Sequence, residues 1–168
     1  MNLKATIGME THVELDTKSK MFCSCEVVET DEPNISVCPT CLGLPGALPV
    51  PNKTAIEYIV MLSLGANCKI TNEGMFHRKN YFYPDLPKNY QISQFDFPVG
   101  VNGSLEIVLD EELHSVEIER VHMEEDTGKS VHMGSGRIDS ATSTLLDFNR
   151  SCLLYTSDAA DDAHSVDL

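Results

Sequence analysis

The stretch IGMETHVELD, residues 7–16, alternates between two kinds of side chain. One parity carries no charge and is mostly apolar, namely Ile7, Met9, Thr11, Val13 and Leu15. The other parity carries the polar series Glu10, His12, Glu14 and Asp16. Side chains alternate between the two faces of a β-strand, so the pattern predicts a strand over about residues 6–15. One side of this strand is expected to face a core, and the other to present a carboxylate, an imidazole and a carboxylate.

The rest of the chain predicts more strands and one clear helix. The segment PNKTAIEYIVMLSLGANC has helical periodicity, with Asn52 as the N-cap and with Gly65 and Asn67 at its end. Three further segments read as strands, namely SLEIVLD, SVEIERVHMEED and STLLDFNR. A segment rich in Cys and Pro at 21–50 and a loop at 76–98 are expected to be irregular. The sequence therefore predicts an α+β fold with a mostly antiparallel sheet.

Length and composition place the chain among soluble globular domains. Its 168 residues are enough for one domain with a core, and 42% of them are hydrophobic. The longest apolar run is too short to cross a bilayer, and the first residues lack the pattern of a secretory signal. We therefore expect a cytoplasmic protein that makes no use of a membrane. A formal net charge of −14 argues against broad non-specific binding to nucleic acid.

The last residues differ from the rest of the chain. From about Cys152 the periodicity stops, and the segment CLLYTSDAADD resembles the translation of a sequencing-library adapter. We therefore expect residues 1–150 to be the amino-terminal part of one domain and residues 151–168 to be a non-native tail. A natural disordered tail is the alternative.

Four cysteines form two close pairs, Cys23-x-Cys25 and Cys38-x-x-Cys41. Paired cysteines on short loops are typical of tetrahedral zinc sites. Four protein ligands leave no open coordination position, so we predict a structural Zn²⁺. Disulfides and free thiols are the alternatives, and disulfides are uncommon in the cytosol.

Two polar motifs are candidates for chemistry. The motif VHMEEDTGK gathers Glu124, Glu125 and Asp126, and a sheet can place Glu125 on one surface with Glu10 and His12. Carboxylates with one imidazole suit Mg²⁺ bound together with substrate phosphates. A solvated strand end is the alternative explanation. The loop HRKNYFYPDLPKNYQISQ adds Lys79 and Lys88, cations that can orient phosphates or a carboxylate.

Five segments together resemble one family. IGMETHVELDTKSKMFC, CPTCLGLPGALPVPNK, RKNYFYPDLPKNYQISQFD, HMEEDTGKS and DFNR resemble the amino-terminal cradle domain of the GatB family, the B subunits of the aspartyl/glutamyl-tRNA(Asn/Gln) amidotransferases. The resemblance covers nearly all of residues 5–150. It implies a cradle fold of the glutamine synthetase and guanido kinase class.

The resemblance also implies an activity. Members of this family are ligases of protein biosynthesis that phosphorylate the side-chain carboxylate of Glu-tRNA(Gln) or Asp-tRNA(Asn) with ATP. Ammonia then displaces the phosphate, giving Gln-tRNA(Gln) or Asn-tRNA(Asn). The ammonia comes from glutamine through the A-type glutaminase subunit, and the C-type subunit completes the heterotrimer. Regions absent from this chain grip the tRNA, so we expect the chain alone to be inactive.

Site residues are carried over by their positions in these motifs. Glu10, His12 and Glu125 match positions that hold Mg²⁺ against phosphate, and Glu125 is also expected to take a proton from ammonia. Lys79 is expected to contact phosphate or guide ammonia, and Arg150 to reach the nucleotide phosphates. Thr11 departs from the family's usual aliphatic residue, on the opposite face from His12.

Two other readings remain. The archaeal E-type subunit of Glu-tRNA(Gln) amidotransferase shares similar strand motifs, although CPTCLGLPGALPV favours the B type. The second alternative is a non-catalytic binding module whose fold is stabilised by zinc.

Overall fold

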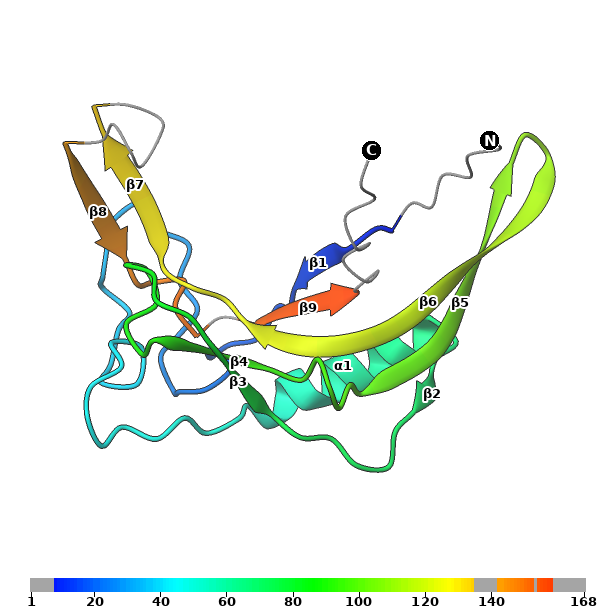
Figure 1. The fold of residues 1–168 in the computed structure, drawn as a ribbon, viewed down its shortest axis with the longest axis horizontal. Helices are drawn as coiled ribbons and strands as arrows, with labels where there is room; N and C mark the ends of the chain where they lie inside the picture. The colour runs from blue at the N-terminus through cyan, green and yellow to red at the C-terminus, as the bar shows by residue number, and fades with distance from the viewer. Residues whose placement is uncertain (1–7, 135–141, 153, 159–168) are drawn as a thin grey trace, which may run out of the picture.

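The computed structural model describes residues 8–134, 142–152 and 154–158, the last five by their backbone alone. A curved antiparallel sheet dominates these residues, and α1, the one helix among them, lies against its convex side (Figure 1). The fold is therefore mostly antiparallel β, as the sequence predicts. The path through the larger sheet is β1-β9-β6-β4-β3, with β5 paired to β6 and β2 paired to β5.

The strands of the larger sheet have these bounds: β1 Thr11–Glu14, β2 Lys69–Ile70, β3 His77–Asn80, β4 Tyr90–Ser93, β5 Gly100–Leu109, β6 Glu112–Glu125 and β9 Leu154–Asp158. A separate hairpin consists of β7 Lys129–Met133 and β8 Ser143–Asp147. Every strand pair in the two sheets is antiparallel. The predicted loop at 76–98 thus contains the short strands β3 and β4, which the sequence analysis missed.

The hairpin β5–β6 is the longest element of the sheet. Leu109 pairs with Glu112, and the two residues between them, Asp110 and Glu111, both have positive φ. A two-residue turn with positive φ at both positions matches the right-handed twist of the strands that it joins. This acidic turn lies at the outer end of the hairpin (Figure 1).

Helix α1 covers Lys53–Gly65 and begins as predicted. The Asn52 side chain accepts a hydrogen bond from the Thr54 backbone N–H at 2.9 Å. Such a cap satisfies one of the free N–H groups of the first turn. The buried side of the helix presents Ala55, Ile59 and Ser63 to a core that includes Met21, Phe22, Val121 and Met123.

Strand β1 is shorter and more exposed than the sequence predicts. It pairs only with β9 among the described residues, so it forms an edge of the sheet. Met9 is 75% exposed and Val13 is 38% exposed. Of the expected apolar side, Leu15, which directly follows β1, packs against the core, whereas Met9 and Val13 do not. Residues 11–14 form a strand, as the alternation predicts, but Met9 and Val13, which were expected to face a core, are exposed.

Strand β9 falls within the segment expected to be a non-native tail. Backbone pairing of an extended segment with two open strand edges depends little on its sequence. The pairing of β9 with β1 and β6 therefore does not decide the origin of residues 151–168, which stays a prediction. The segment 159–168 lies outside the described residues.

No helix within the described ranges is long and apolar enough to cross a membrane.

Close packing of β5 against the end of α1 gives the first testable prediction. A Cβ added at Gly103 would collide with Cys68 Sγ and would lie 2.6 Å from the Ala66 carbonyl oxygen. A Cβ added at Gly65 would meet nothing within 4 Å. We expect Gly103→Ala to lower the free energy of unfolding by roughly 1–3 kcal/mol. Gly65→Ala should be neutral or stabilising by up to about 1 kcal/mol. Urea unfolding of both variants measures the difference, and equal effects would contradict the packing described here.

Candidate functional site

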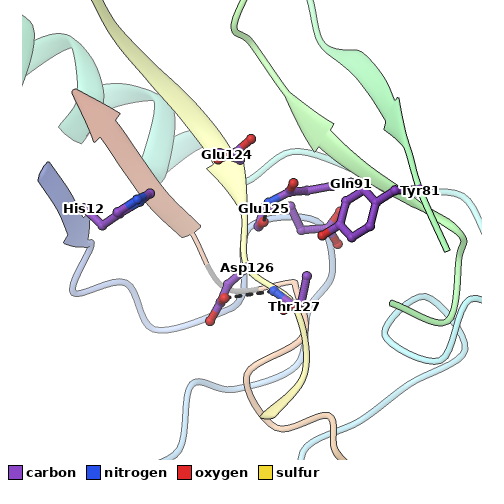
Figure 2. A pocket seen from close by; sticks show the side chains of 7 residues that line it. All are labelled: His12, Tyr81, Gln91, Glu124, Glu125, Asp126 and Thr127. Carbon is purple, nitrogen blue, oxygen red and sulfur yellow. Dashed lines mark hydrogen bonds between the residues drawn. The ribbon is translucent and has the colours of Figure 1, made fainter. Parts of the chain in front are cut away.

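A pocket opens beside the carboxyl end of β6. Its lining consists of His12, Tyr81, Gln91, Glu124, Glu125, Asp126 and Thr127. Figure 2 shows these side chains coming from four places, with His12 on β1 and the acidic residues at the end of β6. Tyr81 follows β3, and Gln91 lies on β4. The structure therefore brings together the first strand, the loop at 76–98 and the acidic motif at one pocket.

The register of the sheet decides which side chains share a face. His12 and His122 both pair with Ser157, and Glu14 and Glu124 both pair with Tyr155. Directly paired residues point to the same side of a sheet. His12 therefore shares a face with His122 and Glu124, whereas Glu125 has the opposite parity.

Glu124 is the carboxylate on the same face as His12. Lys79 Nζ lies 3.8 Å from Glu124 Oε1, and the Glu124 side chain is only 15% exposed. Burial raises the pKa of the Glu124 carboxyl, and the nearby Lys79 ammonium opposes that shift. On the edge strand, His12 Nε2 lies 3.7 Å from Glu10 Oε1. Besides the buried His122, this face thus offers the carboxylates of Glu10, Glu14 and Glu124, the imidazole of His12 and the ammonium of Lys79.

Both carboxylate oxygens of Glu125 interact with neighbouring groups of the chain. Its side chain forms a buried ion pair with Lys88, and both side chains are at most 5% exposed. Its second carboxylate oxygen accepts a hydrogen bond from the Ile92 N–H at 3.2 Å. Burial disfavours the Lys88 ammonium, but the charge of Glu125, the neighbouring Cys152 and the hydrogen bond to Glu125 together outweigh this cost, so the pKa of Lys88 is raised. Both oxygens of Glu125 therefore have protein partners in this structure.

Asp126 continues the acidic rim of the pocket. Its Oδ2 accepts a hydrogen bond from Arg150 Nε at 3.1 Å and lies 2.9 Å from Arg150 Nη2 in an ion pair. Its Oδ1 accepts from the Thr127 N–H at 2.8 Å, the bond drawn in Figure 2. The opposite wall is Tyr81, whose pKa is raised by burial and then by the charge of Asp85. Arg150, predicted to reach nucleotide phosphates, thus comes to the edge of this pocket through Asp126.

His122 is a site residue that the sequence analysis missed. It is 2% exposed and packs edge-on against Phe95, with ring centroids 5.9 Å apart. Burial, and then the charge of Arg120, lowers its pKa to about 4. His122 is therefore a neutral imidazole at neutral pH. The even spacing of Arg120, His122 and Glu124 along the predicted strand is the signal that would have identified it.

The four predicted cysteines form a compact cluster. Their sulfur atoms all lie within 4.8 Å of one another, and no other group of three potential ligands in the described part of the chain is as close. Cys41 Sγ lies 3.6 Å from that of Cys23, 3.7 Å from that of Cys38 and 3.9 Å from that of Cys25. Thiolates at about 2.3 Å from a tetrahedral zinc stand about 3.8 Å apart. The cluster could therefore hold a metal such as zinc.

The cysteine loops are fastened to the turn that follows β8. The Ser36 N–H donates to Asn149 Oδ1 at 2.9 Å, and Asn149 Nδ2 donates to the Glu32 carbonyl at 2.8 Å. Asn34 is bonded to the same turn through Leu146, Asp147 and Phe148. The segment at 21–50 is irregular as predicted, and side-chain hydrogen bonds take the place of regular secondary structure.

The two ion pairs of the site differ in burial, and this difference is testable. Lys88→Met would leave the Glu125 carboxylate buried without its counter-charge, which costs roughly 3–5 kcal/mol of unfolding free energy. Lys79 is 65% exposed, so Lys79→Met should cost less than about 1 kcal/mol. Chemical unfolding at neutral pH compares the two, and a small loss for Lys88→Met would contradict a buried pair.

The lowered pKa of His122 predicts a dependence of stability on pH. Between pH 6.5 and about 4 the unfolded chain binds a proton at His122 that the folded chain does not. Stability is therefore lost as the pH falls, by roughly 2–3 kcal/mol between pH 7.5 and 4.5. His122→Phe should remove this contribution, whereas the exposed control His114→Gln should keep it. The free energy of unfolding of both variants is measured at pH 7.5 and at pH 4.5. An equal change with pH in the two variants would refute the assignment of this pH dependence to His122.

Comparison with known proteins identifies the family of this chain. The GatB/GatE catalytic domain family matches residues 5–154. A relative from Frankia casuarinae is 57% identical over 147 residues, and relatives from Nocardia farcinica and Mycolicibacterium smegmatis are each 58% identical over 148 residues. All three are named as the B subunit of aspartyl/glutamyl-tRNA(Asn/Gln) amidotransferase, and each match covers 86% of this chain.

The chain spans only 29% of the length of these relatives. The family match nevertheless includes every predicted site residue, from Glu10 on the first strand to Arg150 in the turn after β8. The family-level resemblance of the sequence motifs is thereby confirmed, and the chain belongs to the GatB/GatE catalytic domain family, with B subunits of the amidotransferases as its curated relatives.

Proposed function

We propose that residues 1–150 form the amino-terminal part of a catalytic cradle domain that amidates misacylated tRNA. The reaction is the ATP-dependent conversion of Glu-tRNA(Gln) or Asp-tRNA(Asn) into Gln-tRNA(Gln) or Asn-tRNA(Asn). The observation that carries the proposal is the pocket at the end of β6, where His12 meets the acidic motif within a domain of this family. The relatives' names supply the substrates and the type of reaction.

The chemistry requires activation of a carboxylate. A carboxylate is a poor acyl donor to ammonia, and phosphorylation gives it a leaving group. In this proposal Lys79, beside Glu124, neutralises part of the charge of the transferring phosphate. A carboxylate of the acidic motif takes the proton that ammonia loses as it attacks. The predicted base is Glu125, and its contact with Lys88 must then loosen in the complete enzyme.

A divalent cation suits the donors on the face of His12. Glu10, His12 and Glu124 supply carboxylate oxygens and an imidazole, which Mg²⁺ accepts together with water and phosphate. Bound there, Mg²⁺ would neutralise phosphate charge during transfer. The set predicted from the sequence also contains Glu10 and His12. It has Glu125 in place of the neighbouring Glu124 at the end of β6. The assignment of Arg150 to nucleotide phosphate is part of the same proposal.

We also propose that the four cysteines hold structural Zn²⁺. Their sulfur spacing matches a tetrahedral site, and four protein ligands exclude a bound substrate. In this role the metal fastens the loops at 21–50, which have little regular secondary structure of their own.

The remaining parts of the proposal concern assembly. The A-type and C-type amidotransferase subunits are the proposed partners, with ammonia arriving from the A-type glutaminase and tRNA binding mainly outside this chain. The proposed setting is the cytoplasm, and the proposed ancestry of the fold is the glutamine synthetase and guanido kinase class. The names of the relatives favour the B type over the archaeal E type. A non-catalytic module is the other alternative, and it predicts that Glu10→Ala and Glu125→Ala leave activity intact.

The activity is tested by grafting residues 8–150 onto the matching region of the Nocardia farcinica relative, assembled with that relative's own partner subunits. We expect ATP-dependent conversion of Glu-tRNA to Gln-tRNA with free ammonia as donor. His12→Ala and Glu125→Gln should each reduce the rate by about 100-fold or more, the scale of losing an acid–base group. Glu112→Gln, at the exposed turn of the hairpin, is the control. Full activity of both site variants would support the non-catalytic module.

The metal is tested separately. Protein purified without chelator should contain about one zinc per chain, and Cys41→Ser should lose it together with much of its thermal stability, since metal binding contributes to folding. Elemental analysis and thermal unfolding measure both effects. A folded chain with less than about one-tenth equivalent of metal would overturn the zinc site.

A further inference from the structure

Lys20 is a fully buried lysine beside the cysteine cluster, with 0% of its surface exposed. Its ammonium donates to the Ser36 carbonyl at 2.7 Å, to the Phe148 carbonyl at 3.1 Å and to Cys41 Sγ at 3.5 Å. An ammonium has three donors, so these acceptors satisfy all of them. The position of Lys20 is therefore fixed by the cysteine segment, through Ser36 and Cys41, and by the turn at Phe148, which is distant in sequence.

The charge of Lys20 is not balanced by the two carbonyl contacts. Carbonyl groups satisfy hydrogen bonds but carry no net charge, and no carboxylate of the described residues lies within 4.0 Å of Lys20 Nζ. Burial of an ammonium is costly unless an opposite charge is nearby. Among these three acceptors, only Cys41 Sγ can carry negative charge, as a thiolate.

The cysteine cluster with a bound metal would carry a net negative charge. Four thiolates around one divalent metal carry a formal charge of −2, and Cys41 among them is fully buried. We propose that Lys20 is the buried counter-charge of the four-cysteine metal site and positions Cys41 for the metal. This inference rests on the metal site proposed above. The metal-bound thiolates and Lys20 then stabilise one another, because the opposite charge of each lowers the cost of burying the other.

Lys20 is also connected to the pocket, indirectly, through the turn after β8. Its contact with the Phe148 carbonyl holds the turn in which Arg150 lies two residues further on, and Arg150 binds Asp126 of the pocket. Lys20 is thus a positioning residue that connects the metal cluster to the turn beside the site. It acts on the pocket only through this turn.

The test measures zinc affinity of the whole chain by competition with a chromophoric chelator. Lys20→Met should weaken zinc binding about 10–100-fold, as loss of an outer-shell partner does, and should reduce the gain in Tm on zinc loading. Lys20→Arg should recover part of the affinity. Lys18→Met is the matched control, because Lys18 is exposed two residues away, and it should bind zinc like the unmutated chain.

The experiment distinguishes failure of the proposed role of Lys20 from failure of the proposed metal site. A merely structural Lys20 would lower the Tm of metal-free and zinc-loaded protein equally and leave the zinc affinity unchanged, which would overturn its role. Failure of the unmutated chain to bind zinc would overturn the metal site itself.

A second measurement needs no variant. Acetylation of amines in the unmutated chain should be at least about tenfold slower at Lys20 with zinc bound than without it, while Lys18 reacts equally in both, because metal-dependent folding protects the buried amine. Equal rates at Lys20 in the two forms would contradict the mutual stabilisation of the metal site and the buried Lys20.

Discussion

The buried ion pair between Lys88 and Glu125 is the contact on which the architecture of the pocket depends. It ties the end of β6 to the turn before β4, and two further bonds reinforce it. Gln91 Nε2 donates to the Glu125 carbonyl at 2.6 Å, and the Ile92 N–H donates to the Glu125 carboxylate. With Glu125 fixed on one side of the strand, Glu124 must point to the other. The face of His12 and Glu124 is therefore a consequence of how Glu125 is held.

A second group of contacts holds the other side of the site. The irregular cysteine loops bind the turn after β8 through Asn34, Asn149 and Lys20, all by hydrogen bonds that use main-chain groups. Such loops lose much conformational entropy on ordering and bury little apolar surface. A metal site that closes them would supply the missing stabilisation, and its charge would explain the buried lysine. The metal cluster and the pocket would then be two parts of one framework.

Local patterns in the sequence were sufficient for much of this structure. Helix α1 and its Asn52 cap, the β5–β6 hairpin and the clustered cysteines follow from short-range rules of periodicity, capping and spacing. Strands β3 and β4 were missed because four-residue strands rich in polar side chains have no clear alternation. Which neighbour in the acidic motif shares a face with His12 depends on register across β9, and no single segment contains that information. The partnership of Lys88 with Glu125 likewise joins residues 37 positions apart.

The face carrying His12 and Glu124 is, in our proposal, where a divalent cation meets the substrate phosphates. The most direct test adds Mn²⁺, a paramagnetic substitute for Mg²⁺, to the isotope-labelled chain and follows the broadening of amide NMR signals. We predict that signals of His12, Glu124 and Thr127 broaden at the lowest Mn²⁺ concentration. If the acidic turn at 110–112 broadens first and the pocket residues are unaffected, the pocket is not the cation site and the proposal is contradicted.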